Sequence, residues 1–226
     1  MAARDEILWR LRTKLGHSSS LNADNPAAKH IHDHHKNLIP KRGDLDKAQQ
    51  VDLFCEEASK VNATITRIAS KNDIPKCVGD YLRDHQLPAR IKIAPHPTLT
   101  DLNWQATTAL MVDEGRGQGD DGVSVSVAYG GVAETGTLVL TSGPKTPTSL
   151  NFLPLDHIVV LQADDIAGNY EAVWNRIRDD FGTATMPRTV NWITGPSRTA
   201  DIEQTLLLGA HGPQRLHILL VDETQS

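Results

Sequence analysis

The chain has 226 residues, of which 39% are hydrophobic and 23% are charged, and its formal net charge is −5 at pH 7. These values are typical of a globular protein, and the acidic balance disfavours nucleic acid as a partner. No apolar run approaches the roughly 20 residues of a membrane-spanning helix, and the polar start Met1–Glu6 lacks the apolar core of a signal peptide, so we expect a cytoplasmic protein.

The first 43 residues are predicted to form a helix followed by a polar connector. Residues 3–15 repeat apolar side chains at helical spacing, and Gly16 follows where a helix would end. Residues 17–43 are polar and rich in His, Asn, Ser and Lys. We therefore divide the chain into an N-terminal extension, residues 1–43, and an α/β domain, residues 44–226.

The connector contains the densest group of potential metal ligands, which are His30, His32, His34 and His35. Alternate residues share a side only in an extended chain, and a true metal site needs its ligands held by further contacts. Metal binding here is therefore a weak alternative, and we predict no resident metal or other cofactor. Replacing His32, His34 and His35 by Ala should leave stability and function near normal.

From residue 44 onward, helical and strand patterns alternate along the sequence. They predict a helix over 45–61, a strand over 63–68, a helix over 74–86 and a strand over 90–94. This alternation indicates an α/β fold with parallel neighbouring strands.

The second half adds more strands. Residues 113–121 are predicted as a glycine-rich loop, whose glycines are not a dinucleotide fingerprint because no strong strand precedes them and no helix follows. Val123–Val127 alternates Val with Ser, which predicts a half-buried strand. The remaining expected elements are a turn at 130–131, strands over 135–140 and 157–161, a helix over 170–181, a strand over 190–194, a short helix over 200–208 and a last strand over 216–221.

The first candidate motif places one carboxylate and two hydroxyls between glycines at the start of a predicted strand. Its residues are Gly131, Glu134, Thr135, Gly136 and Thr137. Glu134 is a candidate catalytic residue, because such a carboxylate could act as base, nucleophile or hydrogen-bond anchor. Equally, it could cap a turn or pair with Arg198.

The second motif follows the predicted strand 190–194 and opens the predicted short helix. Its candidate ligand-binding residues are Gly195, Pro196, Ser197, Arg198, Thr199, Asp201 and Glu203. Free backbone N–H groups at a helix start, together with Arg198, could bind a small carboxylate or phosphate. The alternative is ordinary helix capping by Ser197 or Thr199, with Asp201 and Glu203 complementing the helix dipole.

Two histidines stand near predicted strand ends. His211 and Gly212 occupy the turn before the last strand, and His157 begins an earlier strand. Strand ends border the ligand crevice in open α/β sheets, so His211 is a second candidate catalytic residue, although either histidine could be purely structural. We predict that the motifs meet in one site, with Glu134 close to Arg198 and His211.

The runs Gly131–Leu140, Gly195–Glu203 and Leu208–Pro213, in this order, resemble the LUD-domain family, with the lactate utilisation protein C type as the nearest group. The resemblance covers roughly residues 45–222. It implies a bacterial protein used in growth on L-lactate, beside iron–sulfur partner proteins that oxidise lactate to pyruvate. It also implies a fold like ribose-5-phosphate isomerase and the CoA transferases, with a mainly parallel central sheet flanked by helices. The chain has only Cys55 and Cys77, too few for a four-cysteine cluster of its own.

Two functions remain open at this point. The first is an accessory or assembly subunit of an L-lactate oxidising system, which alone should show neither lactate oxidation nor a visible cofactor spectrum. The alternative is an independent small-molecule enzyme of the CoA transferase or sugar-phosphate isomerase class that uses Glu134.

Overall fold

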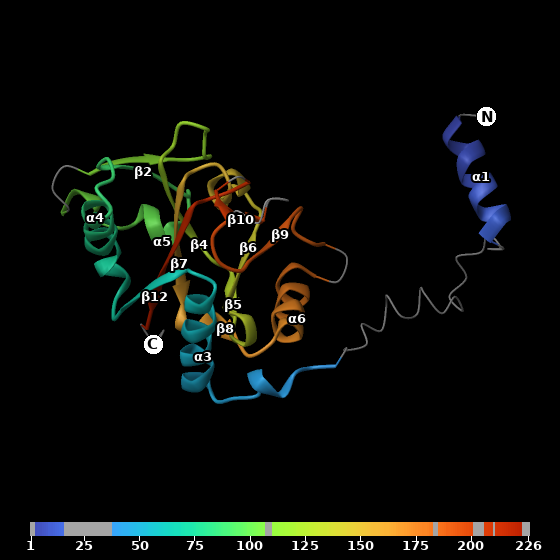
Figure 1. The fold of residues 1–226 in the computed structure, drawn as a ribbon, viewed down its shortest axis with the longest axis horizontal. Helices are drawn as coiled ribbons and strands as arrows, with labels where there is room; N and C mark the ends of the chain where they lie inside the picture. Colours follow the sequence, from blue (N-terminus) through green and yellow to red (C-terminus); the bar gives the residue numbers. More distant parts are fainter. Residues whose placement is uncertain are drawn as a thin grey trace. The chain divides into compact units, whose positions relative to one another are not determined.

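The computed structural model describes residues 3–15, 38–106, 110–182, 185–200, 206–209 and 211–222 (Figure 1). The chain divides into two units, Met1–Leu38 and Ile39–Ser226. The described part of the first unit is helix α1 (Ala3–Leu15), which agrees with the prediction and leaves Ile7, Trp9 and Leu11 exposed. The four histidines His30, His32, His34 and His35 lie outside the described residues.

A six-stranded sheet, parallel throughout, forms the centre of the second unit. Its order is β1-β12-β7-β4-β2-β3, and its pairs are all parallel. The strands are β1 (Thr64–Ile68), β2 (Arg90–Ile93), β3 (Met111–Glu114), β4 (Val123–Val127), β7 (Asp156–Gln162) and β12 (Arg215–Val221). The predicted α/β fold with a mainly parallel central sheet is confirmed.

Helices cover both faces of this sheet, with α4 on one face and α3 on the other; Figure 1 shows both helices beside it. Three of the predicted helices are confirmed within a few residues, as α3 (Lys47–Lys60), α4 (Ile74–Asp84) and α6 (Tyr170–Phe181), and a short α5 (Pro97–Thr100) adds to them. Local signals explain their starts. Asp46 and Gln49 form a capping box before α3, Pro75 lies in the first turn of α4, and Asn169 caps α6.

The two faces of the sheet build separate hydrophobic clusters. Ile158 and Val160 of β7 pack with α4, whereas Val159 and Leu161 pack with α3. Because both faces are covered, Ser124 and Ser126 are buried, with 0% and 3% of their surface exposed. The prediction of a half-buried strand at β4 was therefore wrong, although the strand itself is confirmed.

The edge strand β3 was also missed. Residues 113–121 were expected to form a loop, but Asp113 and Glu114 end a strand that pairs with β2. Glu114 is exposed, and charged residues are common on edge strands, where no apolar alternation marks them in sequence.

A second, smaller sheet lies beside the first and contains the first candidate motif. Its order is β8-β5-β6-β9, with β5 (Gly130–Val132), β6 (Thr137–Thr141), β8 (Ile166–Ala167) and β9 (Val190–Ile193). Gly130 and Gly131 were predicted as a turn, but they form a strand that pairs with β6 and β8. Phe54 and Ile166 pack so closely at Gly131 that a side chain would not fit there. The turn falls later, at the 3₁₀ helix η4 (Ala133–Thr135). Helix α6 packs on this sheet through Val173 and Ile177.

The predicted helix over 200–208 was wrong. Arg198–Ala200 (β10) and Leu206–Leu208 (β11) pair as antiparallel strands, and Gly209 donates its N–H to the carbonyl of Ser197 to close the pair. No helix therefore begins at Gly195–Arg198, so the predicted helix-end anion cradle and the capping role of Ser197 or Thr199 are both wrong. The β-branched Thr199 suits a strand, and the cross-strand pairing overrides the short helical pattern.

Short 3₁₀ helices connect the other elements. They are η1 (Lys41–Gly43), η2 (Lys71–Asp73), η3 (Trp104–Ala106), η5 (Thr148–Asn151) and η6 (Ala163–Asp165). The start of α3 is held to η6 and β8 by Lys47, whose Nζ donates to the carbonyls of Asp164 and Ile166 at 2.7 and 2.5 Å. Within the described ranges, no helix has the length and apolarity to cross a membrane.

Candidate functional site

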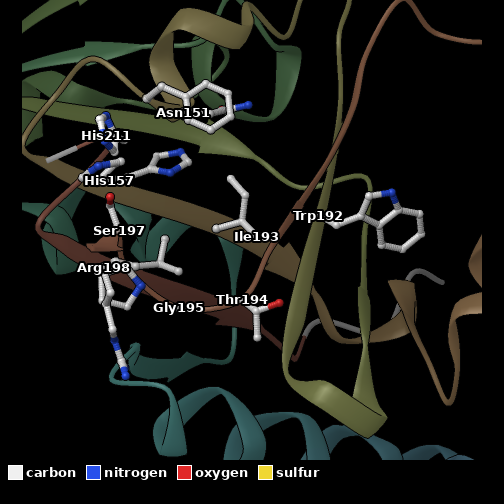
Figure 2. A pocket seen from close by; sticks show the side chains of 14 residues that line it. Asn151, His157, Trp192, Ile193, Thr194, Gly195, Ser197, Arg198 and His211 are labelled. Atoms are coloured by element: carbon white, nitrogen blue, oxygen red, sulfur yellow. The ribbon is translucent and has the colours of Figure 1, made fainter. Parts of the chain in front are cut away.

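A cavity of about 300 Å³ lies where the second motif meets the turn before β12. It is lined by residues 151–152, His157, residues 192–198, residues 211–213 and Leu216. Figure 2 shows the side chains of His157, Ser197 and His211 gathered at one side of it. The cavity thus combines two imidazoles, a hydroxyl and an apolar wall, a composition suited to a small polar ligand. We call it the histidine cavity.

The N-terminal half of the second motif and the His211-Gly212 turn come together in this cavity. The backbone N–H of Ser197 donates to the carbonyl of Pro213 at 2.9 Å, and Gly212 packs against the Ser197 side chain. The cavity lies at the amino ends of β7 and β12, which begin at Asp156 and Arg215, rather than at their carboxyl ends.

His157 is the most deeply buried polar group of the cavity wall. Its Nε2 lies 2.6 Å from the hydroxyl of Ser126, and its Nδ1 is buried without a hydrogen-bond partner among the described residues. Burial lowers the pKa of His157 to about 3, so the ring is neutral at neutral pH. One ring nitrogen is therefore held by Ser126, and the other is buried without a hydrogen-bond partner among the described residues.

A pair of charges steadies the strand ends beneath the cavity. Asp156, directly before His157, accepts hydrogen bonds from the Tyr81 hydroxyl at 2.8 Å and from Nη2 of Arg215 at 2.7 Å. The hydrogen bond to Asp156 raises the pKa of Arg215. Because Asp156 starts β7 and Arg215 starts β12, this pair fixes the relative position of the strands that carry His157 and Leu216.

The first motif is linked to the cavity through hydroxyl groups, although none of its residues is among the described lining residues. Thr137 Oγ1 lies 2.7 Å from Thr135 Oγ1, 3.0 Å from the Tyr170 hydroxyl and 2.7 Å from Oγ1 of Thr194. Thr194 in turn lines the cavity, because β6 and β9 are paired and their motif residues end side by side. Gly131 and Gly136 are buried in the backbone of the same region.

Glu134 is not among the described residues that line the histidine cavity. Its side chain is 4% exposed, and its ion-pair partner is Arg42, with 3.7 Å between Nε and Oε2. Its other oxygen accepts the backbone N–H of Tyr170 at 3.4 Å, at the start of α6. The expected alternative of a Glu134–Arg198 pair is therefore wrong, whereas the expected cap on a neighbouring backbone segment matches the contact with Tyr170.

Arg198 has a different neighbour from the one predicted. Its guanidinium donates to the backbone carbonyl of Val61, and Figure 2 shows it extended away from His157 and His211. Gly195, Pro196 and Arg198 line the cavity, and Thr199 lies in β10. Asp201 and Glu203 lie outside the described residues.

Several lining residues carried no signal in the sequence. Asn151 ends η5 and Phe152 follows it; behind the lining, Ser126 reaches His157 from the neighbouring strand β4. The alternation of Ser and Val in β4 could have indicated a buried hydroxyl only if both faces of the strand had been known to be covered. Across the described ranges, no group of three or more His, Cys, Asp or Glu side chains could hold a metal ion.

Comparison with known proteins gives a consistent family. Lactate utilization protein C from Bacillus subtilis is 36% identical over 93 residues, which are 41% of this chain and 39% of that protein. Lactate utilization protein C from Bacillus pumilus is 25% identical over 97% of both chains. The matching stretch therefore covers about two fifths of the length of the Bacillus subtilis protein.

The fold has a solved relative. The crystal structure of a DUF162 family protein from Deinococcus radiodurans aligns with a TM-score of 0.56 and 20% identity, over 79% of this chain and 99% of that one. In sequence, residues 51–221 match the LUD domain model, which is most of the chain. The chain therefore belongs to the LUD domain family.

Proposed function

We propose that this chain is an accessory subunit in the use of lactate, which binds a small carboxylic acid in the histidine cavity and acts with iron–sulfur partner proteins. The observation that carries the proposal is the buried His157 beside Ser197 and His211, in a cavity of about 300 Å³. This volume is at the small end of ligand sites, as a three-carbon acid requires. The similarity to proteins named Lactate utilization protein C supports the same role.

The neutral imidazole of His157 suits a hydroxy acid or an oxo acid. With Nε2 paired to Ser126, the free Nδ1 is either a donor to a carboxylate or carbonyl oxygen, or an acceptor of a hydroxyl proton, depending on the tautomer. A buried polar atom without a partner costs about 1–3 kcal/mol, so a ligand that supplies one gains affinity. Ser197 and His211 offer further hydrogen bonds on the same side of the cavity.

An accessory role follows from the chemistry of lactate oxidation. Conversion of lactate to pyruvate releases two electrons and two protons, and an acceptor must take the electrons. The chain carries two cysteines, too few for a four-cysteine cluster, which supports a partner as the electron acceptor. The electrons would then pass to the partner proteins, while this chain holds the acid.

The alternative of an independent transferase or isomerase that uses Glu134 is less favoured. A nucleophile or base must reach its substrate, but the Glu134 carboxylate is buried between Arg42 and the backbone of Tyr170 and is not among the described lining residues of the cavity. We assign Glu134 the role of an anchor that holds η1 and the start of α6 together.

Isothermal titration of the purified full chain with L-lactate and with pyruvate tests the binding site. We expect binding of at least one acid, and we expect Ser197→Ala and His211→Ala to weaken it about tenfold each. The matched control is His85→Ala, an exposed histidine outside the cavity lining, which should bind as the parent does. No binding of either acid, or equal loss in the control, would contradict the site.

A second experiment tests the accessory role. In the native host, deletion of the gene should abolish growth on L-lactate, and the parent gene should restore it, while the purified chain alone should not oxidise L-lactate with an artificial electron acceptor. Turnover by the isolated chain would show that it is the dehydrogenase itself. Normal growth of the deletion strain on L-lactate would remove the chain from the process altogether.

A further inference from the structure

We propose that a second cavity, of about 640 Å³, binds the phosphate groups of a small phosphorylated molecule. This cavity is defined by the loops after β2 and β3, the turn after β6 and the segment before β9, and we call it the arginine cavity. It shares no lining residue with the histidine cavity, and the inference is independent of the proposed role in lactate use.

The charge of the arginine cavity is opposite to that of the whole chain. Arg116 and Arg188 line it, and no acidic residue is among its described lining residues, although the chain carries a net charge of −5. Neither arginine has an acidic or hydrogen-bonding partner within the described ranges. Many other arginines of the domain lie 3.2 Å or less from an aspartate oxygen, as do Arg67, Arg90, Arg176 and Arg215.

The wall of the cavity adds neutral donors without partners. The hydroxyl oxygen of Ser149 is buried and has no hydrogen-bond partner among the described residues. The backbone N–H groups of Arg116 and Gly117 likewise have no acceptor among the described residues, because the loop bonds form at Gly115, Gln118 and Asp121 instead. Guanidinium groups, a hydroxyl and loop N–H groups together match the several oxygens of a phosphate.

The location of the cavity favours a ligand rather than a solvated charged surface. Pro95 follows the carboxyl end of β2, and Gly115–Gly117 follow the carboxyl end of β3. Open parallel sheets bind their ligands outside the carboxyl ends of the strands, where loops supply the contacts. The histidine cavity lies at the opposite ends of β7 and β12, so the arginine cavity is the one that follows this rule.

Size and charge define the class of ligand. Two arginines on one cavity suit a group with at least two negative charges, and Arg binds phosphate in a bidentate way. A volume of about 640 Å³ leaves room for an organic part beyond one phosphate, as in a sugar phosphate or a nucleotide. A carboxylate with a single charge would pair with only some of these hydrogen-bond donors.

Titration of the full chain at low ionic strength with inorganic diphosphate, and separately with ADP, tests the proposal. We expect diphosphate to bind to the parent chain. The double variant Arg116→Gln/Arg188→Gln should bind it at least about tenfold more weakly, because one hydrogen bond to a charged group contributes at least about tenfold in affinity. Tighter binding of ADP than of diphosphate would identify a nucleotide as the source of the phosphates. Equal binding would show that the phosphates alone are recognised.

The matched control is Arg4→Gln/Lys14→Gln, which removes the same two charges from exposed positions on α1. It should bind diphosphate as the parent does, which separates a local site from the effect of net charge. Failure of the parent to bind diphosphate or ADP would overturn the proposal. Equal weakening in both double variants would also overturn it, because the arginine cavity would then have no special part.

Discussion

Two buried histidines should make the domain lose stability in mild acid. His157 on β7 has a pKa lowered to about 3 by burial. His217 on β12 has a pKa lowered to about 4, mainly by burial and further by the nearby His85. The ring of His217 stacks on Tyr81 at 4.7 Å, and its Nδ1 lies 2.8 Å from the hydroxyl of Thr64, so its surroundings are closely packed.

The sign of the effect follows from proton linkage. An unfolded histidine titrates near pH 6.5, so between pH 6.5 and the folded-state pKa the unfolded chain binds protons that the folded chain does not. The free energy of unfolding therefore falls as the pH drops below about 6.5. Between pH 7.5 and pH 5 the loss is about 2 kcal/mol for each histidine, about 4 kcal/mol for both, and it hardly depends on the exact folded-state pKa.

Urea unfolding followed by tryptophan fluorescence at pH 7.5, 6 and 5 measures this loss. The variant His157→Gln keeps a nitrogen near Ser126 but cannot titrate, so its loss between pH 7.5 and pH 5 should be about 2 kcal/mol smaller than that of the parent. The double variant His157→Gln/His217→Gln should lose about 4 kcal/mol less than the parent. If His157→Gln loses as much stability as the parent over this range, burial of a neutral His157 is refuted.

Other substitutions test the supports of the fold and the first motif. Gly136→Ala should cost about 3 kcal/mol or more in urea unfolding, because φ is 61° and the added Cβ would lie 2.1 Å from the backbone nitrogen of Ala58; a near-normal midpoint would contradict this packing. Asp156→Asn should cost about 2 kcal/mol through the weakened bond to Arg215, and parent-like stability would show that this pair contributes nothing. Glu134→Gln should change the free energy of unfolding by less than about 1 kcal/mol and leave growth on L-lactate near normal, since an amide oxygen still accepts the backbone N–H of Tyr170; clearly slowed growth would argue for a chemical role of the carboxylate.

The elements predicted correctly from the sequence are those whose buried residues recur at a regular spacing. Helices α3, α4 and α6 carry apolar stripes and clear starts, and β7 and β12 are continuous apolar runs typical of parallel strands. Prediction failed where pairing partners decide the conformation. Glycines 130–131 look like a turn in isolation, but their pairing with β6 and β8 makes them a strand.

Only the backbone segments that build the site could be predicted from the sequence. Gly195–Ser197 and His211–Gly212 carry a local signature, and they do come together around one cavity. The pairing of His157 with Ser126 was not predictable, because it depends on β4 lying next to β7 in the sheet. The partner of Glu134 was missed for the same reason, since Arg42 belongs to a segment that the sequence marks only as a polar connector.

Gly43 of η1 packs against Gly168 in the turn before α6, so the two positions restrict each other's substitutions. A Cβ on Gly43 would lie 2.1 Å from the carbonyl oxygen of Gly168, and a Cβ on Gly168 would lie 2.0 Å from that of Gly43. Neither position can therefore gain a side chain unless the two backbones move apart, and that movement would draw Arg42 away from Glu134. In related chains, these two glycines should be kept or lost together, and a chain that has lost both should also have lost the Arg42–Glu134 pair.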